Sequence, residues 1–334
     1  MDTASSTLNR RSVSQGALAL CATLALGVAA AAQPHGAAGE RSIGEWLMRM
    51  NDASRQRSYI GTFVVSSGDG TMSSARIWHA CDGQHQIERV ETLSGALRST
   101  FRRDDEVLTF LPESRTVRSE RRASLGLFPE LLKPGESAIP DFYTASRVGS
   151  DRVAGFAADV VQVLPRDKLR FGYRIWSEKK SGLVVKLQTL DASGKVLEQA
   201  AFSELRLDVP VGMERLARMM AVPAGWQVEK AEAVKTTAAA EGWTLGTPVP
   251  GFEPMSCYKR PAEGMLQWIF SDGLASVSVF VEDYDASRHL REGAFASGAT
   301  HTLTRRVQDF WVTLVGEVPA PTLRAFSLGL ARSR

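Results

Sequence analysis

The sequence predicts a mainly β (α+β) protein with two folded parts, and three observations lead to that prediction. The chain has 334 residues, which is enough for about two domains. Short stretches of strand character follow one another between residues 59 and 207, separated by turn dipeptides such as Asp-Gly and Ser-Gly. Small residues then dominate 230–242, and strand-like segments resume after Trp243.

Composition and charge exclude several classes of protein. Hydrophobic residues make up 44% and charged residues 23% of the chain, a balance that excludes disordered, collagen-like and coiled-coil proteins. The formal net charge is +3, from 40 Lys and Arg against 37 Asp and Glu. This excess is too small for a protein that coats nucleic acid or binds membranes through a polybasic surface.

Residues 1–32 are predicted to be a signal peptide. Arg10 and Arg11 form its charged start, residues 16–32 form its apolar segment, and three alanines precede a cleavage site before Gln33. A retained membrane anchor is disfavoured because the apolar run is slightly short and rich in Ala. The arginine pair leaves twin-arginine export open, although the general secretory route is favoured. We therefore expect an exported protein.

The first domain is predicted at 40–208 as one curved antiparallel sheet with one or two helices. A helix is expected at 42–57, because Ser42 and Glu45 have capping-box spacing and apolar residues recur at helical intervals. Strands are expected at 59–67, 72–81, 85–93, 97–103, 106–111, 153–165, 169–178, 183–190 and 195–207.

An apolar segment at 123–145, broken by three prolines, interrupts these strands. Two interpretations are open: the segment fills the concave face of the sheet as core, or it covers that face and yields to an acyl chain. The candidate lipid-binding residues are Leu125, Leu127, Phe128, Leu131, Leu132, Ile139, Phe142 and Tyr143.

Residues 209–242 are predicted to link the first domain to a smaller domain at 243–330. The linker contains a short helical pattern at 213–220. In the second domain we expect a hairpin at 264–283 around Asp272-Gly273, two strands within 299–315 and a closing helix that begins near Pro319. If the hairpin lies at a sheet edge, an extended or helical partner segment could add to it as a strand or pack on its face.

Apart from an S-x-x-K match at 177–180, which stands at a predicted strand end and is interpreted as chance, the sequence lacks motifs for catalysis and metal binding. It contains no G-x-S-x-G, H-E-x-x-H, P-loop or G-x-G-x-x-G motif. His79, Cys81 and His85 surround a predicted turn without an evident fourth ligand, so we interpret them as polar strand positions. We predict a binding protein with no catalytic residue, no metal and no cofactor.

Two further features leave alternatives open. Cys81 and Cys257 remain after signal cleavage and could pair in an oxidising compartment, although they fall in different predicted domains. Seven arginines between residues 98 and 122 are nearly balanced by acidic residues, which favours a solvated face over a site for a phosphate-bearing or acidic partner.

Four segments resemble the RseB (MucB) family of periplasmic sigma-E regulators. They are WLMRMNDASRQRSYIGTFVVSSG at 46–68 and the segments at 170–205, 270–283 and 312–326, and the resemblance covers about residues 44–330. It implies an N-terminal unclosed barrel shaped like the lipoprotein carriers LolA and LppX, with helices in its mouth. It also implies a C-terminal domain that helps to grip the periplasmic region of a membrane-bound anti-sigma factor of the RseA/MucA type.

The resemblance further implies a periplasmic negative regulator of the envelope-stress sigma factor. Its binding shields the anti-sigma factor from the first-cutting protease, and lipid or lipopolysaccharide releases it. The family has no catalytic residues to carry over. The alternative function is a periplasmic lipid or lipoprotein carrier, for which the first domain alone would suffice. Nucleic acid is not expected as a partner, and the oligomeric state stays open.

Overall fold

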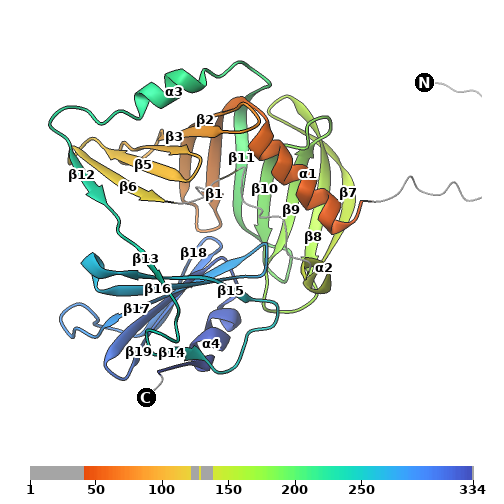
Figure 1. Cartoon of the computed structure of the whole chain (residues 1–334). Helices are drawn as coiled ribbons and strands as arrows, with labels where there is room; N and C mark the ends of the chain where they lie inside the picture. Colours follow the sequence, from red (N-terminus) through yellow and green to blue (C-terminus); the bar gives the residue numbers. More distant parts are fainter. Residues whose placement is uncertain (1–40, 122–127, 129–137, 333–334) are drawn as a thin grey trace, which may run out of the picture. The chain divides into compact units, whose positions relative to one another are not determined.

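The protein is mainly β, as the sequence predicts (Figure 1). The computed structural model describes residues 41–121, 128 and 138–332. Two large, mainly antiparallel sheets contain most of the regular structure, and the described helices are few and mostly short. The helices are α1 (Ile43–Gln56), α2 (Ile139–Phe142), α3 (Met213–Met219), α4 (Ala320–Gly329) and the 3-10 helix η1 (Pro261–Glu263).

The first sheet has twelve strands in the order β12-β6-β5-β4-β3-β2-β1-β11-β10-β9-β8-β7. The strands are β1 (Tyr59–Ser67), β2 (Met72–Cys81), β3 (Gln86–Thr92), β4 (Ser99–Arg103), β5 (Glu106–Leu111), β6 (Thr116–Arg121), β7 (Tyr143–Val153), β8 (Phe156–Pro165), β9 (Gly172–Glu178), β10 (Val184–Leu190), β11 (Val196–Leu207) and β12 (Gln227–Lys230). Neighbours run antiparallel except β12, which pairs with β6 in parallel. Within the described residues no pairing joins the edge strands β12 and β7, so the barrel wall is unclosed, as expected.

The second sheet has seven strands in the order β13-β15-β16-β17-β20-β19-β18. The strands are β13 (Val234–Thr236), β15 (Glu253–Arg260), β16 (Met265–Ser271), β17 (Ser276–Asp283), β18 (Gly293–Ser297), β19 (Thr300–Val307) and β20 (Phe310–Gly316), while β14 (Trp243–Leu245) and β21 (Leu330–Arg332) form a separate pair. The predicted hairpin is β16–β17, and it lies between β15 and β20. Both of its strands are therefore paired on both sides, so the edge position that strand addition requires is not met, and packing of a partner segment on the face of the hairpin stays a prediction.

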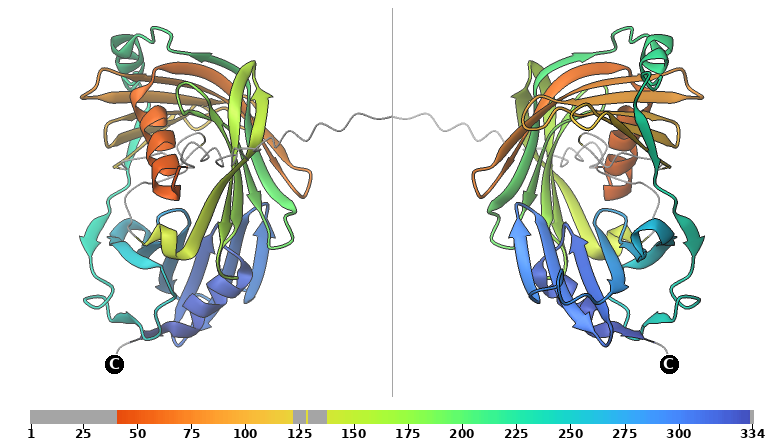
Figure 2. Two further views of the ribbon diagram at one scale, coloured as in Figure 1. Left: turned by 90° about the vertical axis from the view of Figure 1, so that its right-hand side faces the viewer. Right: turned by 90° about the vertical axis from the view of Figure 1, so that its left-hand side faces the viewer.

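The two faces of the first sheet carry different helices (Figures 1 and 2). On the inner face of the curve, α1 buries Trp46 and Met50 to 2% and 1% exposure. The predicted capping box starts this helix, with the Ser42 hydroxyl accepting from the Glu45 amide at 3.3 Å. Leu216 and Met220, within and just after α3, pack in a second cluster with aromatic side chains of β4 and β5. Burial of such side chains contributes about 1.5–3 kcal/mol each, which fixes the helices to opposite faces.

The strand predicted at 153–165 is β8, but it begins at Phe156, because a hairpin turn that joins it to β7 occupies the start of the predicted range. β7 ends at Val153 and β8 begins at Phe156, while Ala154 and Gly155 have φ angles of 48° and 87°. Two successive positive φ values are those of a tight hairpin turn, in which the first position here is an alanine. Alanine is not a usual residue for this turn, so the sequence pattern reads as one continuous strand.

Residues 209–242 contain three regular elements. α3 packs on the outer face of the first sheet, β12 extends that sheet at its edge, and β13 joins the second sheet. The chain therefore passes from one sheet to the other between Lys230 and Val234.

Candidate functional site

The inner face of the first sheet is lined by one continuous apolar cluster. α1 contributes Ile43, Trp46, Leu47 and Met50, and the strands contribute buried residues of β1 to β3, of β5 and of β7 to β11, at alternate positions in β1 and β2. This alternation follows from the two-residue period of a strand, which points every second side chain toward the helix. Those predicted lipid-binding residues that the structure describes belong to this cluster or pack against it.

Three phenylalanines form the centre of this cluster. The Phe128 ring centroid lies 4.9 Å from that of Phe202 on β11 and 5.6 Å from that of Phe63 on β1. Gly61 makes room for Phe202, because a β-carbon at position 61 would lie 2.5 Å from the Phe202 Cε1 atom. Tilted and edge-to-face rings at these separations attract one another beyond the area that they bury. The arrangement is an aromatic floor above β1 and β11.

The structure describes four of the eight predicted lipid-binding residues and brings them into this one cluster. Phe128, Ile139 and Tyr143 are 3%, 4% and 1% exposed, and Phe142 is partly buried against the same cluster. Leu125, Leu127, Leu131 and Leu132 lie outside the described residues.

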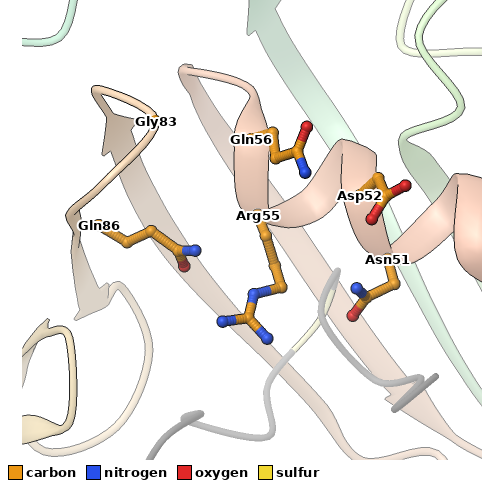
Figure 3. Close-up of a pocket in the computed structure, with 6 residues that line it drawn as sticks. All are labelled: Asn51, Asp52, Arg55, Gln56, Gly83 and Gln86. Atoms are coloured by element: carbon orange, nitrogen blue, oxygen red, sulfur yellow. The ribbon is translucent and has the colours of Figure 1, made fainter. Parts of the chain in front are cut away.

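A polar pocket opens beside the C-terminal end of α1, and none of the predicted lipid-binding residues that the structure describes lines it. Its volume is about 570 Å³, and its lining residues are Asn51, Asp52, Arg55, Gln56, Gly83 and Gln86 (Figure 3). One arginine, one aspartate and three amides present hydrogen-bonding groups, and none of these side chains is apolar. The pocket therefore offers no environment for an acyl chain.

A buried ion pair joins the first sheet to the β16–β17 hairpin. Arg170, in the loop between β8 and β9, donates from Nε to Asp272 Oδ2 at 2.7 Å, and both side chains are 0% exposed. The Tyr143 hydroxyl donates to the same oxygen at 2.9 Å. Burial raises the pKa of Tyr143 far above its ordinary value, so this hydroxyl keeps its proton and remains a donor. We call Tyr143, Arg170 and Asp272 the joint.

The surroundings of Arg170 satisfy the rest of its guanidinium. Nη1 donates to Asp167 in the same loop, and Nη2 donates to the Pro250 carbonyl at 2.6 Å. The Phe142 ring lies 4.2 Å and the Phe252 ring 4.9 Å from the guanidinium carbon. A buried arginine with hydrogen bonds on all three nitrogens and aromatic faces beside it is held in one geometry.

Further contacts between the two sheets surround the joint. The Thr322 hydroxyl of α4 donates to the Leu169 carbonyl at 2.6 Å, and the Phe171 ring stacks edge-on against His301 at 5.6 Å. Leu274, at the tip of the β16–β17 hairpin, packs against the apolar cluster of the first sheet. The core of the first sheet is therefore completed by a side chain from the second.

Two polar positions differ from their predicted environment. Arg102, predicted on a solvated face, is 2% exposed and donates to Glu88 at 2.9 Å. His79, predicted on a polar strand face, is 1% exposed, stacks on Tyr59 at 4.9 Å and hydrogen-bonds to the Arg57 carbonyl at 2.7 Å. Both point to the inner face, where a strand pattern alone does not distinguish a paired buried charge from an exposed one.

The described residues contain no cluster of three or more His, Cys, Asp or Glu side chains that could hold a metal ion. Cys81 and Cys257 are free thiols and form no disulfide with each other. Among the described helices, none is long and apolar enough to cross a membrane.

Comparisons with known proteins place both sheets in one family. The model of the MucB/RseB N-terminal domain matches residues 42–220, and that of the MucB/RseB C-terminal domain matches residues 237–331. The sigma factor AlgU regulatory protein MucB of Pseudomonas aeruginosa is 29% identical in an alignment over 300 residues that covers 86% of this chain and 90% of that protein. The sigma-E factor regulatory protein RseB of Escherichia coli K12 is 28% identical over 298 residues, covering 84% and 88% of the two chains.

Solved structures agree with the sequence comparisons. The structure of the Pseudomonas aeruginosa MucA/MucB complex matches with a TM-score of 0.66 at 27% identity, over 87% of this chain and 99% of that one. MucB crystallised alone matches with a TM-score of 0.63 at 25% identity, over 86% and 97% of the two chains. Because the family models together span both sheets and the first alone covers more than half of the chain, this protein belongs to the MucB/RseB family.

Proposed function

We propose that this chain is a periplasmic regulator that binds the periplasmic region of a membrane-bound anti-sigma factor of the MucA/RseA type. The observation that supports this proposal most strongly is the likeness to MucB in complex with MucA(peri), which has a TM-score of 0.63 at 26% identity and covers 87% of this chain. The likeness includes both sheets, whereas a lipid carrier needs only the first. By shielding the bound segment from proteolysis, the protein restrains release of the sigma factor.

We propose in addition that the mature protein is exported by the signal peptide at 1–32, acts by binding and not by catalysis, and uses its two parts differently. The first part, 40–208, holds the apolar cluster and takes up acyl chains, while 243–330 contributes the main contacts with the anti-sigma factor. Residues 209–242 connect the two parts.

The test of partner binding uses the mature chain, starting at Gln33, and a labelled periplasmic segment of the cognate anti-sigma factor. Saturable binding of this segment, but not of the cytoplasmic part of the same anti-sigma factor, supports the proposal. Absence of binding to the periplasmic segment, together with saturable binding of a lipid, would instead support the carrier function.

A lipid signal is favoured by the aromatic floor formed by Phe63, Phe128 and Phe202. These rings lie within an apolar cluster between α1 and the sheet, where each buried methylene of a ligand contributes about 0.8 kcal/mol. Displacement of Phe128 from this cluster would leave an apolar space beside the two remaining rings. The proposed ligand is therefore an acyl chain, as carried by a phospholipid or lipopolysaccharide.

The lipid proposal is tested with pyrene-labelled palmitate and the variant Phe128→Asp. A matched control is Phe295→Asp on β18, because Phe295 is 57% exposed and belongs to the second sheet. We expect Phe128→Asp to weaken palmitate binding at least tenfold and Phe295→Asp to leave it unchanged. Equal palmitate affinities in the two variants, with both shown to be folded by circular dichroism, would mean that the acyl chain does not bind at the aromatic floor.

A further inference from the structure

The two oxygens of the Asp272 carboxylate perform different tasks. Oδ1 accepts from the amides of Leu274 and Ala275 at 2.9 and 2.7 Å and so closes the turn of the β16–β17 hairpin. Oδ2 accepts from Arg170 and Tyr143, which belong to the first sheet. The same side chain therefore sets the shape of the hairpin tip and attaches that tip to the first sheet.

Tyr143 connects this attachment to the proposed acyl-chain site. It is the first residue of β7 and directly follows α2, whose Ile139 belongs to the apolar cluster that contains Phe128. Because Tyr143 is 1% exposed and its hydroxyl is bonded to Asp272, a shift of α2 or of the start of β7 changes the geometry at Oδ2.

Arg170 has a second acidic partner besides Asp272, so its charge would stay paired if the joint opened. When Asp272 withdraws, the guanidinium still donates to Asp167, which lies three residues away in the same loop. The Asp272 carboxylate in turn keeps the amides of Leu274 and Ala275 as donors to its other oxygen. When the joint opens, the buried guanidinium of Arg170 is therefore not left without a partner. The large free-energy penalty of an unpaired buried charge is avoided, so the contact between Arg170 and Asp272 can open.

We propose that the joint couples the two binding sites: an acyl chain that displaces α2 or Tyr143 loosens the β16–β17 hairpin and weakens binding of the anti-sigma factor by the second sheet. This inference rests on the proposed function and names the residues that transmit its regulation. Thermodynamic linkage requires that the bound anti-sigma segment weaken palmitate binding by the same factor. Asp272 and Tyr143 act here as positioning residues.

The variant Asp272→Asn separates the two tasks of the carboxylate. The amide oxygen can still close the hairpin turn, whereas the amide nitrogen meets the donors of Arg170 and Tyr143 and repels them. Asp285→Asn is the matched control, because Asp285 also accepts from a turn amide, that of Ser287, and pairs with a nearby arginine, Arg288, and both partners lie in its own segment.

The first readout is hydrogen exchange in the ligand-free mature chain. We expect Asp272→Asn to raise exchange both at 271–276 and at 139–145, and Asp285→Asn to raise it at neither. Faster exchange at 271–276 alone, or at neither segment, would overturn the coupling. This readout needs no ligand, so its result stands even where the proposed function fails.

The second readout is the factor by which saturating palmitate weakens binding of the anti-sigma segment. In the wild type and in Asp285→Asn we expect a factor of about five or more. In Asp272→Asn this factor should fall to about one while both ligands still bind. Tyr143→Phe should give an intermediate factor, because Arg170 keeps its contact with Asp272. An unchanged factor in Asp272→Asn would overturn the inference, whereas loss of either ligand in the wild type would count against the proposed function itself.

Discussion

Nε of Arg170 lies 2.7 Å from Oδ2 of Asp272, and 102 residues of sequence separate the two. Neither side chain is exposed to solvent. The pair belongs to two different sheets, so an isolated fragment ending at residue 208 would keep Arg170 without this partner and would lack Leu274 from its core. Point variants of the full chain are therefore better tests of each sheet's role than truncations.

Loss of Arg170 should destabilise the fold strongly. In Arg170→Ala, Asp272 stays buried without its cation, which costs about 3–5 kcal/mol. The control is Arg57→Ala, whose partner Asp208 lies 2.8 Å away with both side chains well exposed, so the expected loss is below about 1 kcal/mol. Urea unfolding of the two variants measures the difference, and equal losses would contradict a structural role of the buried pair.

Truncation of an aromatic ring in the floor should also be costly. Phe202→Ala removes a ring that contacts Phe63, Phe128 and Tyr59, and the resulting cavity should lower the free energy of unfolding by about 3–5 kcal/mol. Phe295→Ala at an exposed position should change it by about 0.5 kcal/mol or less. If palmitate binds in the space vacated by the Phe202 ring, it should restore part of the lost stability of Phe202→Ala. An unfolding midpoint of Phe202→Ala that does not shift with palmitate would argue against acyl-chain binding in this space.

Glu198 should make stability depend on pH. Partial burial and the nearby Asp69 raise its pKa above the ordinary 4.5, although the Ala299 amide and the Ser67 hydroxyl donate to it. Its contribution to stability is therefore full below pH 4.5 and is lost as the pH rises through the raised pKa. In Glu198→Gln the neutral amide does not ionise, so this loss of stability with rising pH is absent.

The free energy of unfolding of Glu198→Gln, relative to wild type, should thus increase between pH 4.5 and neutral pH and then become constant. Glu204→Gln, on the exposed part of the same strand, serves as the control. A difference that does not change with pH would mean that the Glu198 carboxyl is not perturbed.

Proteolysis should cut the connection between the sheets first. Lys230, the last residue of β12, and Lys235, within β13, are exposed, and residues 231–233 between the two strands belong to neither sheet. After limited trypsin treatment the two fragments should remain associated in the wild type, because the joint holds them together, and should separate more readily in Asp272→Asn. Early cleavage within 150–205, with 209–242 intact, would contradict this boundary.

Much of the fold follows from local sequence patterns, and the misses have identifiable physical causes. The capping box at Ser42 and the turn at Asp272-Gly273 are short-range signals, and both mark real boundaries. The hairpin at Ala154 was missed because its first turn residue is not a typical one. β7 was missed because its inner end, Tyr143, lies in an apolar segment that hides the strand period.

The site was predictable only in part for a different reason. The apolar character of Phe128, Ile139 and Tyr143 indicates burial, and the structure brings these residues into one cluster. Asp272 reads in the sequence as a turn residue, because its local task is indeed to close a turn. Its contact with Arg170 depends on tertiary structure, which no spacing rule between residues so far apart can supply.

The central claim, that this chain shields an anti-sigma factor, is tested most directly by a protection assay. The periplasmic segment of the cognate anti-sigma factor is incubated with the protease that cuts it first, with and without an equimolar amount of the mature chain. The account predicts that the chain slows cleavage at least tenfold and that palmitate restores it in the wild type but not in Asp272→Asn. Cleavage at the same rate with and without the chain, under conditions where the protease cuts a control substrate normally, would contradict the claim.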